Sequence, residues 1–332
     1  MKPNSIILIF LIFFFTDCIQ KQNEFEDKSF FLNALTTQVT GTPKSFGVNI
    51  PINSRLARGC ETRIGNLTSE AIAYKANATI GIHNGGNIRD EQGIKAIYPD
   101  GIIPKGTIPT IDLIRKFLPF TGGLVRVNMR AYRIKQALES AVGKLNIKAE
   151  RSIENMDADG PTHGNCWLNP LTTGSGRFFQ VSSKVQIELN PSALSAVVSG
   201  SGASNTLLIT TEGKRVIRIF IDGILLYDNP TGEINSGWNA GSSSCTIKGI
   251  NFTSSAACNF YSVGIPRFQY DGGDANPSLN SNMLEINNDG SVLLLESGIA
   301  ANLDDATIFY DYIQTFTTGA AFSKISNRII MP

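Results

Sequence analysis

Residues 82–90 (IHNGGNIRD) carry the side chains with the clearest potential for chemistry or ligand binding. They follow a short apolar run, and Gly85 and Gly86 permit backbone conformations with positive φ that other residues resist. Asn87 is the next-best residue for such a conformation. A sharp turn alone would explain these three residues. The guanidinium of Arg89 beside exposed backbone N–H groups would in addition form a cradle for an anionic or hydroxyl-rich ligand.

The sequence offers little for bond breaking. Its two histidines are His83 and His163, and neither stands in a Ser/His/Asp, Cys/His or metal-ligand arrangement. We expect His83 to be a pocket-wall residue or a buried residue, and His163 to be solvated in a polar loop. The adjacent acids Asp304 and Asp305 are typical of the first turn of a helix. We therefore predict no catalytic residue, no metal site and no cofactor in this chain.

The elements that would position these residues alternate between helical and strand patterns. Apolar spacing and capping residues predict helices over residues 66–77, 128–145 and 304–316 and a short helix within residues 107–120. Apolar runs and alternation predict strands over residues 78–82 and 177–190 and within residues 205–226, with Asp222 and Gly223 at a hairpin turn. Residues 146–175 are expected to form an extended polar loop and residues 229–258 an insertion. This mixed order predicts an α+β domain.

The N-terminal segment is typical of an export signal. One lysine precedes ten unbroken apolar residues, 6–15, which are too few to span a bilayer comfortably but suit a signal-peptide core. Cys18 follows, as at the lipidation site of bacterial lipoproteins, so lipid anchoring at Cys18 and plain secretion are alternatives. We predict a signal peptide over residues 1–17, a tether over residues 19–45 and a folded domain over residues 46–332, located in the periplasm or at the cell surface.

Four cysteines remain after this segment, and an exported chain can pair them in three ways. The short loop between Cys245 and Cys258 favours that pair. By elimination, Cys60 would then pair with Cys166. Free buried thiols are the alternative.

Five motifs stand in order along the chain. They are E-T-R-I-G-N-L from Glu61, N-G-G-N-I-R from Asn84, L-P-F-T-G from Leu118, F-F-Q-V-S-S from Phe178 and F-Q-Y-D-G-G-D from Phe268. Each motif is weak alone, but their order and the spacing within the last one resemble the C-terminal, substrate-binding domain of the 5'-nucleotidase family. The resemblance covers about residues 50–332 and implies a layered α/β/β/α sandwich.

The resemblance implies that five side chains bind a nucleoside or nucleotide. Asn84 and Arg89 would contact the nucleotide, and Asp274 would hold the ribose hydroxyls. Phe120 and Phe268 would sandwich the base, and stacking of this kind contributes about 1–3 kcal/mol per base. For either phenylalanine alone, packing in the core would be the more common role. The supporting backbone would be provided by Gly85, Gly86, Gly272 and Gly273.

Several positions depart from the family pattern. Asn87 replaces the third glycine of its motif, which could narrow the approach to the backbone. The helix after G-N-L lacks the family's arginine, and Lys75 is the nearest cation. Because lysine cannot reproduce the planar fork of arginine, phosphate recognition has less support than base and ribose recognition. Asp271 and Ala275 also replace the usual asparagine and aromatic residue of the last motif.

The family's hydrolytic domain has no counterpart in this sequence. In the family that domain precedes the substrate-binding domain and holds two metal ions through aspartates, an asparagine and several histidines, the ligand set that two-metal hydrolysis needs. This sequence contains no D-x-H and no G-N-H-E run, and we expect too few residues ahead of Asn84 for such a domain.

These features predict an exported nucleoside- or nucleotide-binding domain. It would be the specificity half of a nucleotide phosphohydrolase, with a metallophosphoesterase and its divalent metals on a separate chain. The alternative is a stand-alone, non-catalytic binding lipoprotein or surface adhesin that reuses the fold. The net charge of +1 and the lack of a basic stripe in the sequence do not indicate binding of DNA or RNA. Contact with a membrane is expected only through a lipid at Cys18.

Overall fold

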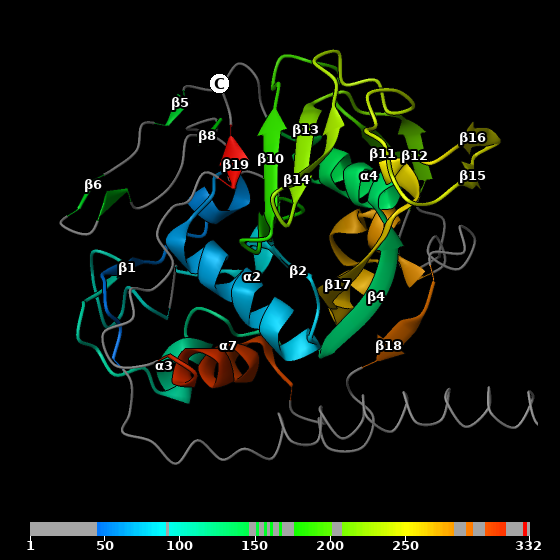
Figure 1. Cartoon of the computed structure of the whole chain (residues 1–332). Coiled ribbons are helices and arrows are strands. Elements are labelled where there is room, and N and C mark those ends of the chain that lie inside the picture. Colours follow the sequence, from blue (N-terminus) through cyan, green and yellow to red (C-terminus); the bar gives the residue numbers. More distant parts are fainter. Residues whose placement is uncertain are drawn as a thin grey trace, which may run out of the picture. The chain divides into compact units, whose positions relative to one another are not determined.

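The computed structural model describes residues 45–90, 93–145, 176–200, 208–281, 290–294, 303–316 and 328–330, together with the backbone of four short strands between residues 151 and 167. All of them belong to the unit Pro43–Pro332 (Figure 1). The predicted signal peptide, Cys18, the tether up to residue 44 and His163 lie outside the described residues. Among the helices that are described, none combines the length and hydrophobicity that crossing a bilayer requires.

A five-stranded sheet carries the glycine motif. Its strands are, in spatial order, β18 (Val292–Leu294), β4 (Leu124–Arg130), β17 (Phe260–Pro266), β2 (Ile80–Asn84) and β9 (Phe179–Val181). β2 and β17 run parallel, and the other neighbours are antiparallel. All residues of β2 are buried, because a helix packs on one face of the sheet and further core elements pack on the other. The buried strand predicted at residues 78–82 is thus confirmed and continues to Asn84.

Helices pack on one face of this sheet. They are α2 (Arg63–Ala76), which contacts the sheet, α7 (Asp305–Gln314), which packs against α2, and α3 (Ile111–Arg115), which packs against α7. Gly81 lets α2 approach closely, since a Cβ there would overlap the carbonyl oxygen of Ser69. The helix ends at Asn77, which takes the left-handed conformation with φ 47°. The helices predicted over residues 66–77 and 304–316 are confirmed, although α2 begins earlier, at Arg63.

The other face packs against helix α4 (Ala131–Val142) and a second sheet. The strands of this sheet are, in spatial order, β14 (Ile224–Asp228), β13 (Val216–Ile221), β10 (Val185–Leu189) and β19 (Ile329–Ile330). Apolar side chains of both sheets and of α4 form one core cluster. The predicted hairpin turn is confirmed, because Asp222 and Gly223 link β13 to β14 with φ values of 52° and 76°.

Two predicted elements have the wrong bounds. The helix expected over residues 128–145 begins only at Ala131, because residues 124–130 form β4, whose alternate side chains enter the core. The single strand expected over residues 177–190 is two strands, β9 and β10, which belong to different sheets and are separated by residues 182–184. In both places an apolar pattern continues across a boundary that the tertiary arrangement sets.

Besides a hairpin within residues 229–258, four small ribbons accompany the two sheets in the described part of the chain. They are β1 (Ile50–Pro51) with β3 (Ile102–Ile103), β5 (Arg151–Ser152) with β8 (Cys166–Trp167), β6 (Met156–Asp157) with β7 (Gly160–Pro161), and β11 (Val197–Ser199) with β12 (Leu208–Thr211). The expectation of one extended loop over residues 146–175 is therefore wrong, since backbone pairing forms short strands within it. The predicted fold class, α+β with layered sheets and helices, is confirmed.

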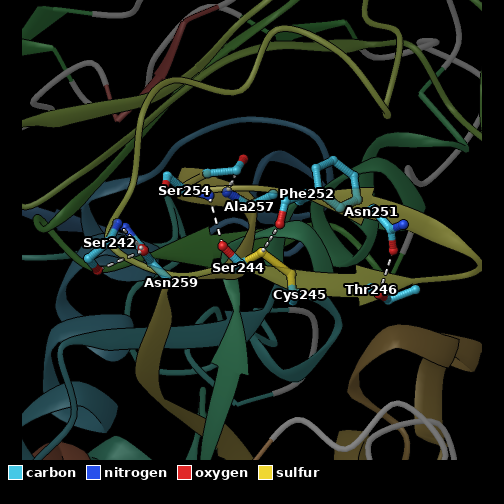
Figure 2. Close-up of a disulfide and its surroundings, with 11 residues drawn as sticks. Ser242, Ser244, Cys245, Thr246, Asn251, Phe252, Ser254, Ala257 and Asn259 are labelled. Carbon is cyan, nitrogen blue, oxygen red and sulfur yellow. Dashed lines mark hydrogen bonds between the residues drawn. A yellow bond between two sulfur atoms is a disulfide. The ribbon is translucent and has the colours of Figure 1, made fainter.

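Residues 229–258, expected to be an insertion, contain an ordered hairpin (Figure 2). β15 (Cys245–Ile247) pairs with β16 (Ile250–Phe252). A disulfide joins Cys245 to Cys258 with their Cα atoms 5.7 Å apart. Phe252 packs on Tyr132 of α4, with ring centroids 5.8 Å apart. The hairpin therefore contributes its own small apolar cluster at the end of α4.

The predicted disulfide between Cys245 and Cys258 is confirmed. Cys60 also takes part in a disulfide, so a free thiol is excluded at this position. Its predicted partner, Cys166, lies outside the residues whose side chains are described, and that pairing stays a prediction.

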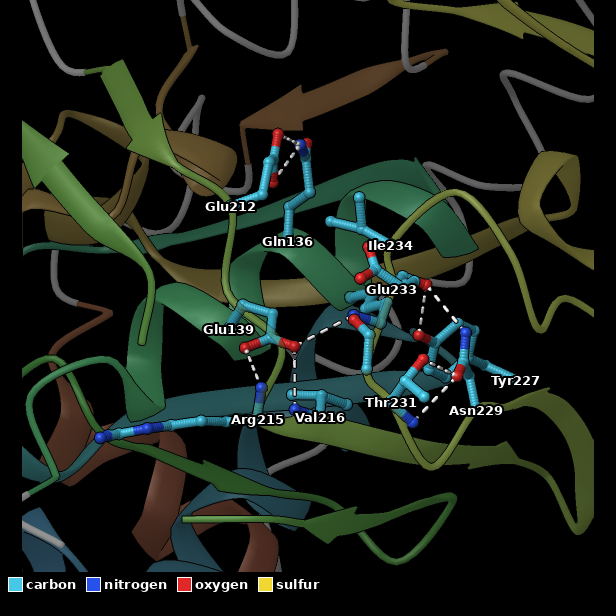
Figure 3. A network of polar contacts seen from close by, with 12 residues as sticks. Gln136, Glu139, Glu212, Arg215, Val216, Tyr227, Asn229, Thr231, Glu233 and Ile234 are labelled. Carbon is cyan, nitrogen blue, oxygen red and sulfur yellow. Dashed lines mark hydrogen bonds and ion pairs between the residues drawn. The ribbon is translucent and has the colours of Figure 1, made fainter. Parts of the chain in front are cut away.

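A buried ion pair fixes α4 to the second sheet (Figure 3). Lys135 Nζ lies 3.0 Å from Glu139 Oε1, and both side chains are almost fully excluded from solvent. Glu139 accepts the backbone N–H groups of Arg215 (3.0 Å) and Val216 (2.8 Å), and Lys135 donates to the carbonyl of Gly232 (3.3 Å). Burial raises the pKa of Glu139 and lowers the pKa of Lys135, while the charge of each partner opposes the shift of the other.

Candidate functional site

A cavity of about 340 Å³ opens at the edge of the five-stranded sheet where β2 and β17 end. Because these two strands are parallel, the segments that follow them reach the same edge. The lining residues are Arg58, Gly86, Asn87, Arg89, Phe120, Thr121, Gly122, Gly123, Gly176, Pro266, Phe268, Asp274 and Asp305. The volume lies within the range of small-molecule sites, about 300–1,000 Å³. Four of the five side chains predicted to bind a ligand line this cavity, and Asn84 does not.

The glycines of residues 82–90 are required by close packing and not by positive φ. Neither Gly85 nor Gly86 has a positive φ, which corrects the expected conformation. A Cβ on Gly85 would overlap the carbonyl oxygen of Ala57, and one on Gly86 would lie 2.8 Å from the Cα of Gly176. The short turn η2 (Gly85–Asn87) therefore lies directly against two other backbone segments, and Gly86 still faces the cavity.

Asn84 lies beneath the cavity wall. Its side chain is fully buried, and its Nδ2 donates to the carboxylate of Asp274 and to Asn87 Oδ1 (2.9 Å). In this arrangement Asn84 positions Asp274 and Asn87. Asn84 Oδ1 has no hydrogen-bond partner among the described residues, and the ligand contact expected of Asn84 stays a prediction.

Asp274 stands among three arginines. It has a φ of 53°, which is a strained conformation for an aspartate, and its carbonyl accepts from Arg177 Nε at 2.9 Å. Burial raises the pKa of the Asp274 carboxyl, and the hydrogen bond from Asn84 opposes this shift. The positive charges of Arg58, Arg177 and Arg89 oppose the pKa shift as well.

Two aromatic rings are exposed at the cavity. Phe120 is 40% exposed and Phe268 is 49% exposed, so neither has the core-packing role that a phenylalanine more commonly has. The ring of Phe268 lies against Gly273, where a Cβ would overlap it, and Gly272 supports this turn with a φ of 94°. The guanidinium of Arg89 stands 5.1 Å from the centroid of the Phe120 ring.

Arg58 is a cavity residue to which the sequence patterns did not point. It ends the short helical turn η1 (Leu56–Arg58). Gln180 of β9 fixes this segment, because its Nε2 donates to the carbonyls of Ala57 (2.9 Å) and Cys60 (2.7 Å). Gln180 belongs to the fourth motif, and Arg58 precedes Glu61 of the first motif by three residues. That proximity to a motif is the signal that could have identified Arg58.

Lys75, the cation considered from the sequence, lies elsewhere. Its Nζ is 2.6 Å from Asp311 Oδ2 on α7, and it does not line the cavity. A second arginine reaches the cavity from another place, because Arg58, which precedes the G-N-L motif, lines the cavity together with Arg89. Two guanidinium groups at one cavity suit an anionic group of a ligand.

Asp305, expected only as a first-turn charge of α7, also lines the cavity. Its Oδ2 accepts from Asn87 Nδ2 at 2.9 Å and lies 3.3 Å from His83 Nε2. His83 is buried, as predicted. Within the part of the chain that the structure describes, no group of three or more His, Cys, Asp or Glu side chains could hold a metal ion.

The chain is thus a layered α+β domain with a cavity whose volume suits a small molecule. The sequence model of the 5'-nucleotidase C-terminal domain matches residues 39–231. The chain belongs to this family. No match was found among curated proteins.

Solved structures of nucleotidases resemble the chain over most of its length. The 5'-nucleotidase precursor of Thermus thermophilus is 19% identical with a TM-score of 0.51, and the match covers 90% of this chain and 40% of that one. The NAD nucleotidase of Haemophilus influenzae is 16% identical with a TM-score of 0.49, and the match covers 95% of this chain and 40% of that one. The Thermus structure shares the fold, and this chain spans about 40% of the length of either protein.

Proposed function

We propose that this chain binds a nucleoside or nucleotide in the cavity at the ends of β2 and β17. The observation that carries the proposal is that two exposed phenylalanine rings, a partly buried carboxylate and two arginines converge on one cavity of about 340 Å³. A nucleotide offers a π face, vicinal hydroxyls and an anionic phosphate to match them. Membership of the 5'-nucleotidase C-terminal domain family supports the same class of ligand.

Each of these groups has its own role in the proposal. Phe120 and Phe268 stack on the base, and Asp274 accepts hydrogen bonds from the ribose hydroxyls. Arg58 and Arg89 bind the phosphate through charge-assisted hydrogen bonds.

We further propose that the chain is the specificity half of a nucleotide phosphohydrolase. Its motifs are those of a substrate-binding domain, and its match spans 40% of the Thermus 5'-nucleotidase precursor. A metallophosphoesterase on a separate chain would hold the divalent metals and generate the attacking hydroxide. The N-terminal apolar run supports export to the periplasm or the cell surface, with lipid attachment at Cys18 and plain secretion as alternatives.

A thermal-shift screen with adenosine, AMP and other nucleosides tests the binding proposal. We expect these ligands to raise the Tm of the wild type and to have little effect on Phe120→Ala, because ligand binding stabilises only a folded state that binds. Phe260→Ala is a matched control, since Phe260 is similarly exposed (48%) and does not line the cavity. No stabilisation by any nucleoside or nucleotide would favour the alternative, a stand-alone binding lipoprotein or adhesin.

Release of phosphate from AMP tests the assignment of catalysis to another chain. We expect the purified chain to release none in the presence of Mg²⁺ or Mn²⁺, because the two-metal ligand set has no counterpart in its sequence. Metal-dependent release by the purified chain alone would show that it hydrolyses nucleotides unaided.

A further inference from the structure

One wall of the cavity carries a group that stacking, ribose binding and phosphate binding leave unused. Asp305 lines the cavity and is only 8% exposed. Its backbone N–H donates to the carbonyl of Phe120 at 3.3 Å. This bond places the carboxylate beside the residue whose ring stacks on the base in the proposed function.

The Asp305 carboxylate is engaged through one oxygen. Oδ2 accepts from Asn87 Nδ2 and lies near His83 Nε2, at 2.9 and 3.3 Å. Across the described ranges, Oδ1 makes no hydrogen bond, and it is not among the atoms that are fully excluded from solvent. Because Asp305 lines the cavity, a ligand that donates a hydrogen bond can reach this oxygen. A poorly solvated carboxylate oxygen favours a ligand that donates a hydrogen bond to it and disfavours one that presents another acceptor.

Asn87 holds this carboxylate in place. The Asn87 amide donates to Asp305 and accepts from Asn84 Nδ2, and Asn84 in turn donates to Asp274. A continuous set of hydrogen bonds therefore connects the two carboxylates of the cavity. A glycine at position 87, as in the family pattern, could not supply the link to Asp305, so this link follows from a departure of the present sequence.

We propose that Asp305 Oδ1 makes the cavity selective for bases with an amino group at C6 of a purine or C4 of a pyrimidine, adenine and cytosine, over hypoxanthine and uracil. The amino group donates a hydrogen bond to Oδ1, whereas hypoxanthine and uracil carry a carbonyl oxygen at the same ring position, which the carboxylate repels. This inference rests on the proposed nucleoside binding and deepens it by naming the class of base.

Titration calorimetry with two matched pairs of nucleosides tests the proposal. Adenosine and inosine, like cytidine and uridine, differ at this edge of the base. We expect the amino member of each pair to bind the wild type about tenfold more tightly, in line with a hydrogen bond to a charged group. In Asp305→Asn, whose amide offers both a donor and an acceptor, the ratio within each pair should fall to about one.

Phe260→Ala is the control, because Phe260 is exposed and does not line the cavity, so all four dissociation constants and both ratios should stay as in the wild type. Equal dissociation constants within each pair for the wild type would overturn the role of Asp305 while nucleoside binding stands. Failure of all four nucleosides to bind would overturn the proposed function and this inference with it. The wild-type ratios decide the matter even if Asp305→Asn does not fold.

Discussion

Burial and ribose binding favour opposite protonation states of the Asp274 side chain. Its partial burial favours the neutral carboxyl in the empty cavity, and burial therefore raises its pKa. Binding of ribose hydroxyls favours the ionised form, because only a carboxylate accepts hydrogen bonds through both oxygens. Asn84 and Arg89 shift the balance back towards ionisation.

Asp274→Asn should make the stability of the ligand-free protein less dependent on pH. A carboxyl whose pKa is raised in the folded state contributes stability that is fully present below its unfolded pKa, usually 3.8, and is lost as the pH rises through the folded pKa. The wild type should therefore lose stability relative to the variant as the pH rises from about 3.5 to 7. Urea unfolding of both proteins across this range measures the difference, and parallel curves would contradict the burial of this group.

Asp274 should also make the cavity prefer ribose to deoxyribose. We expect the wild type to bind adenosine about tenfold more tightly than 2′-deoxyadenosine, because a hydrogen bond to a charged acceptor contributes about 1.5–3 kcal/mol. Asp274→Asn should bind the two with more similar affinities. Calorimetric titration of both ligands provides the comparison, and a wild type that binds them equally would remove Asp274 from the ribose site.

The spacing within a motif allowed us to predict cavity residues that belong to that motif. Phe268 and Asp274 begin and end one motif and do meet at the cavity. Asn84 comes from another motif and does not line the cavity, and its Nδ2 donates to Asp274 and Asn87. Arg58 lies outside the motifs and reaches the cavity through contacts of its segment with a distant strand, which no local pattern contains.

At the scale of elements, the buried pair Lys135–Glu139 joins helix α4 to the start of β13. Glu139 does more than neutralise the lysine charge, since it also accepts two backbone N–H groups. Removal of one partner of a buried ion pair leaves an uncompensated charge in a poorly solvated place.

Glu139→Leu should destabilise the protein more than Lys135→Met. The first variant leaves the Lys135 charge unpaired and the N–H groups of Arg215 and Val216 without their acceptor, and breaking a buried pair in this way costs about 3–5 kcal/mol. The second variant leaves Glu139 with those two backbone bonds, so we expect a smaller loss. Urea unfolding gives the free energy of unfolding for each variant.

The exposed pair Lys184–Asp222 provides the control for this comparison. Lys184→Ala should change the free energy of unfolding by less than about 1 kcal/mol, because exposed ion pairs contribute little. If all three variants lost the same free energy of unfolding, the buried pair Lys135–Glu139 would contribute no more to stability than the exposed pair.

Elements defined by local chemistry could be predicted, and those defined by distant partners could not. The turn at Asp222 follows from its Asp-Gly pair alone. The start of α4 at Ala131 could not be predicted, because the apolar residues before it suit both a helix and a strand. The division of residues 177–190 between two sheets likewise depends on their partners, β2 and β13.

At the scale of the whole molecule, the cavity exists only in the assembled domain. Its lining residues come from segments between Arg58 and Asp305, which span most of the described chain. A ligand bound there would stabilise the entire fold, and any change that separates these segments would abolish binding. The fold class could be predicted because the motifs extend along the domain. The place of the cavity could not, because it depends on the parallel pairing of β2 with β17.

Calorimetric titration of AMP into the wild type and the Phe120→Ala/Phe268→Ala double variant tests whether the two rings at the cavity bind a nucleotide. We expect one AMP per chain for the wild type and an affinity at least about tenfold weaker for the double variant, because each stacked ring contributes about 1–3 kcal/mol. Phe260→Ala, whose ring is exposed away from the cavity lining, should retain the wild-type affinity. A wild type that binds neither AMP nor adenosine would show that the cavity is no nucleotide site. A double variant that binds AMP as tightly as the wild type would show that the two rings do not stack on the base.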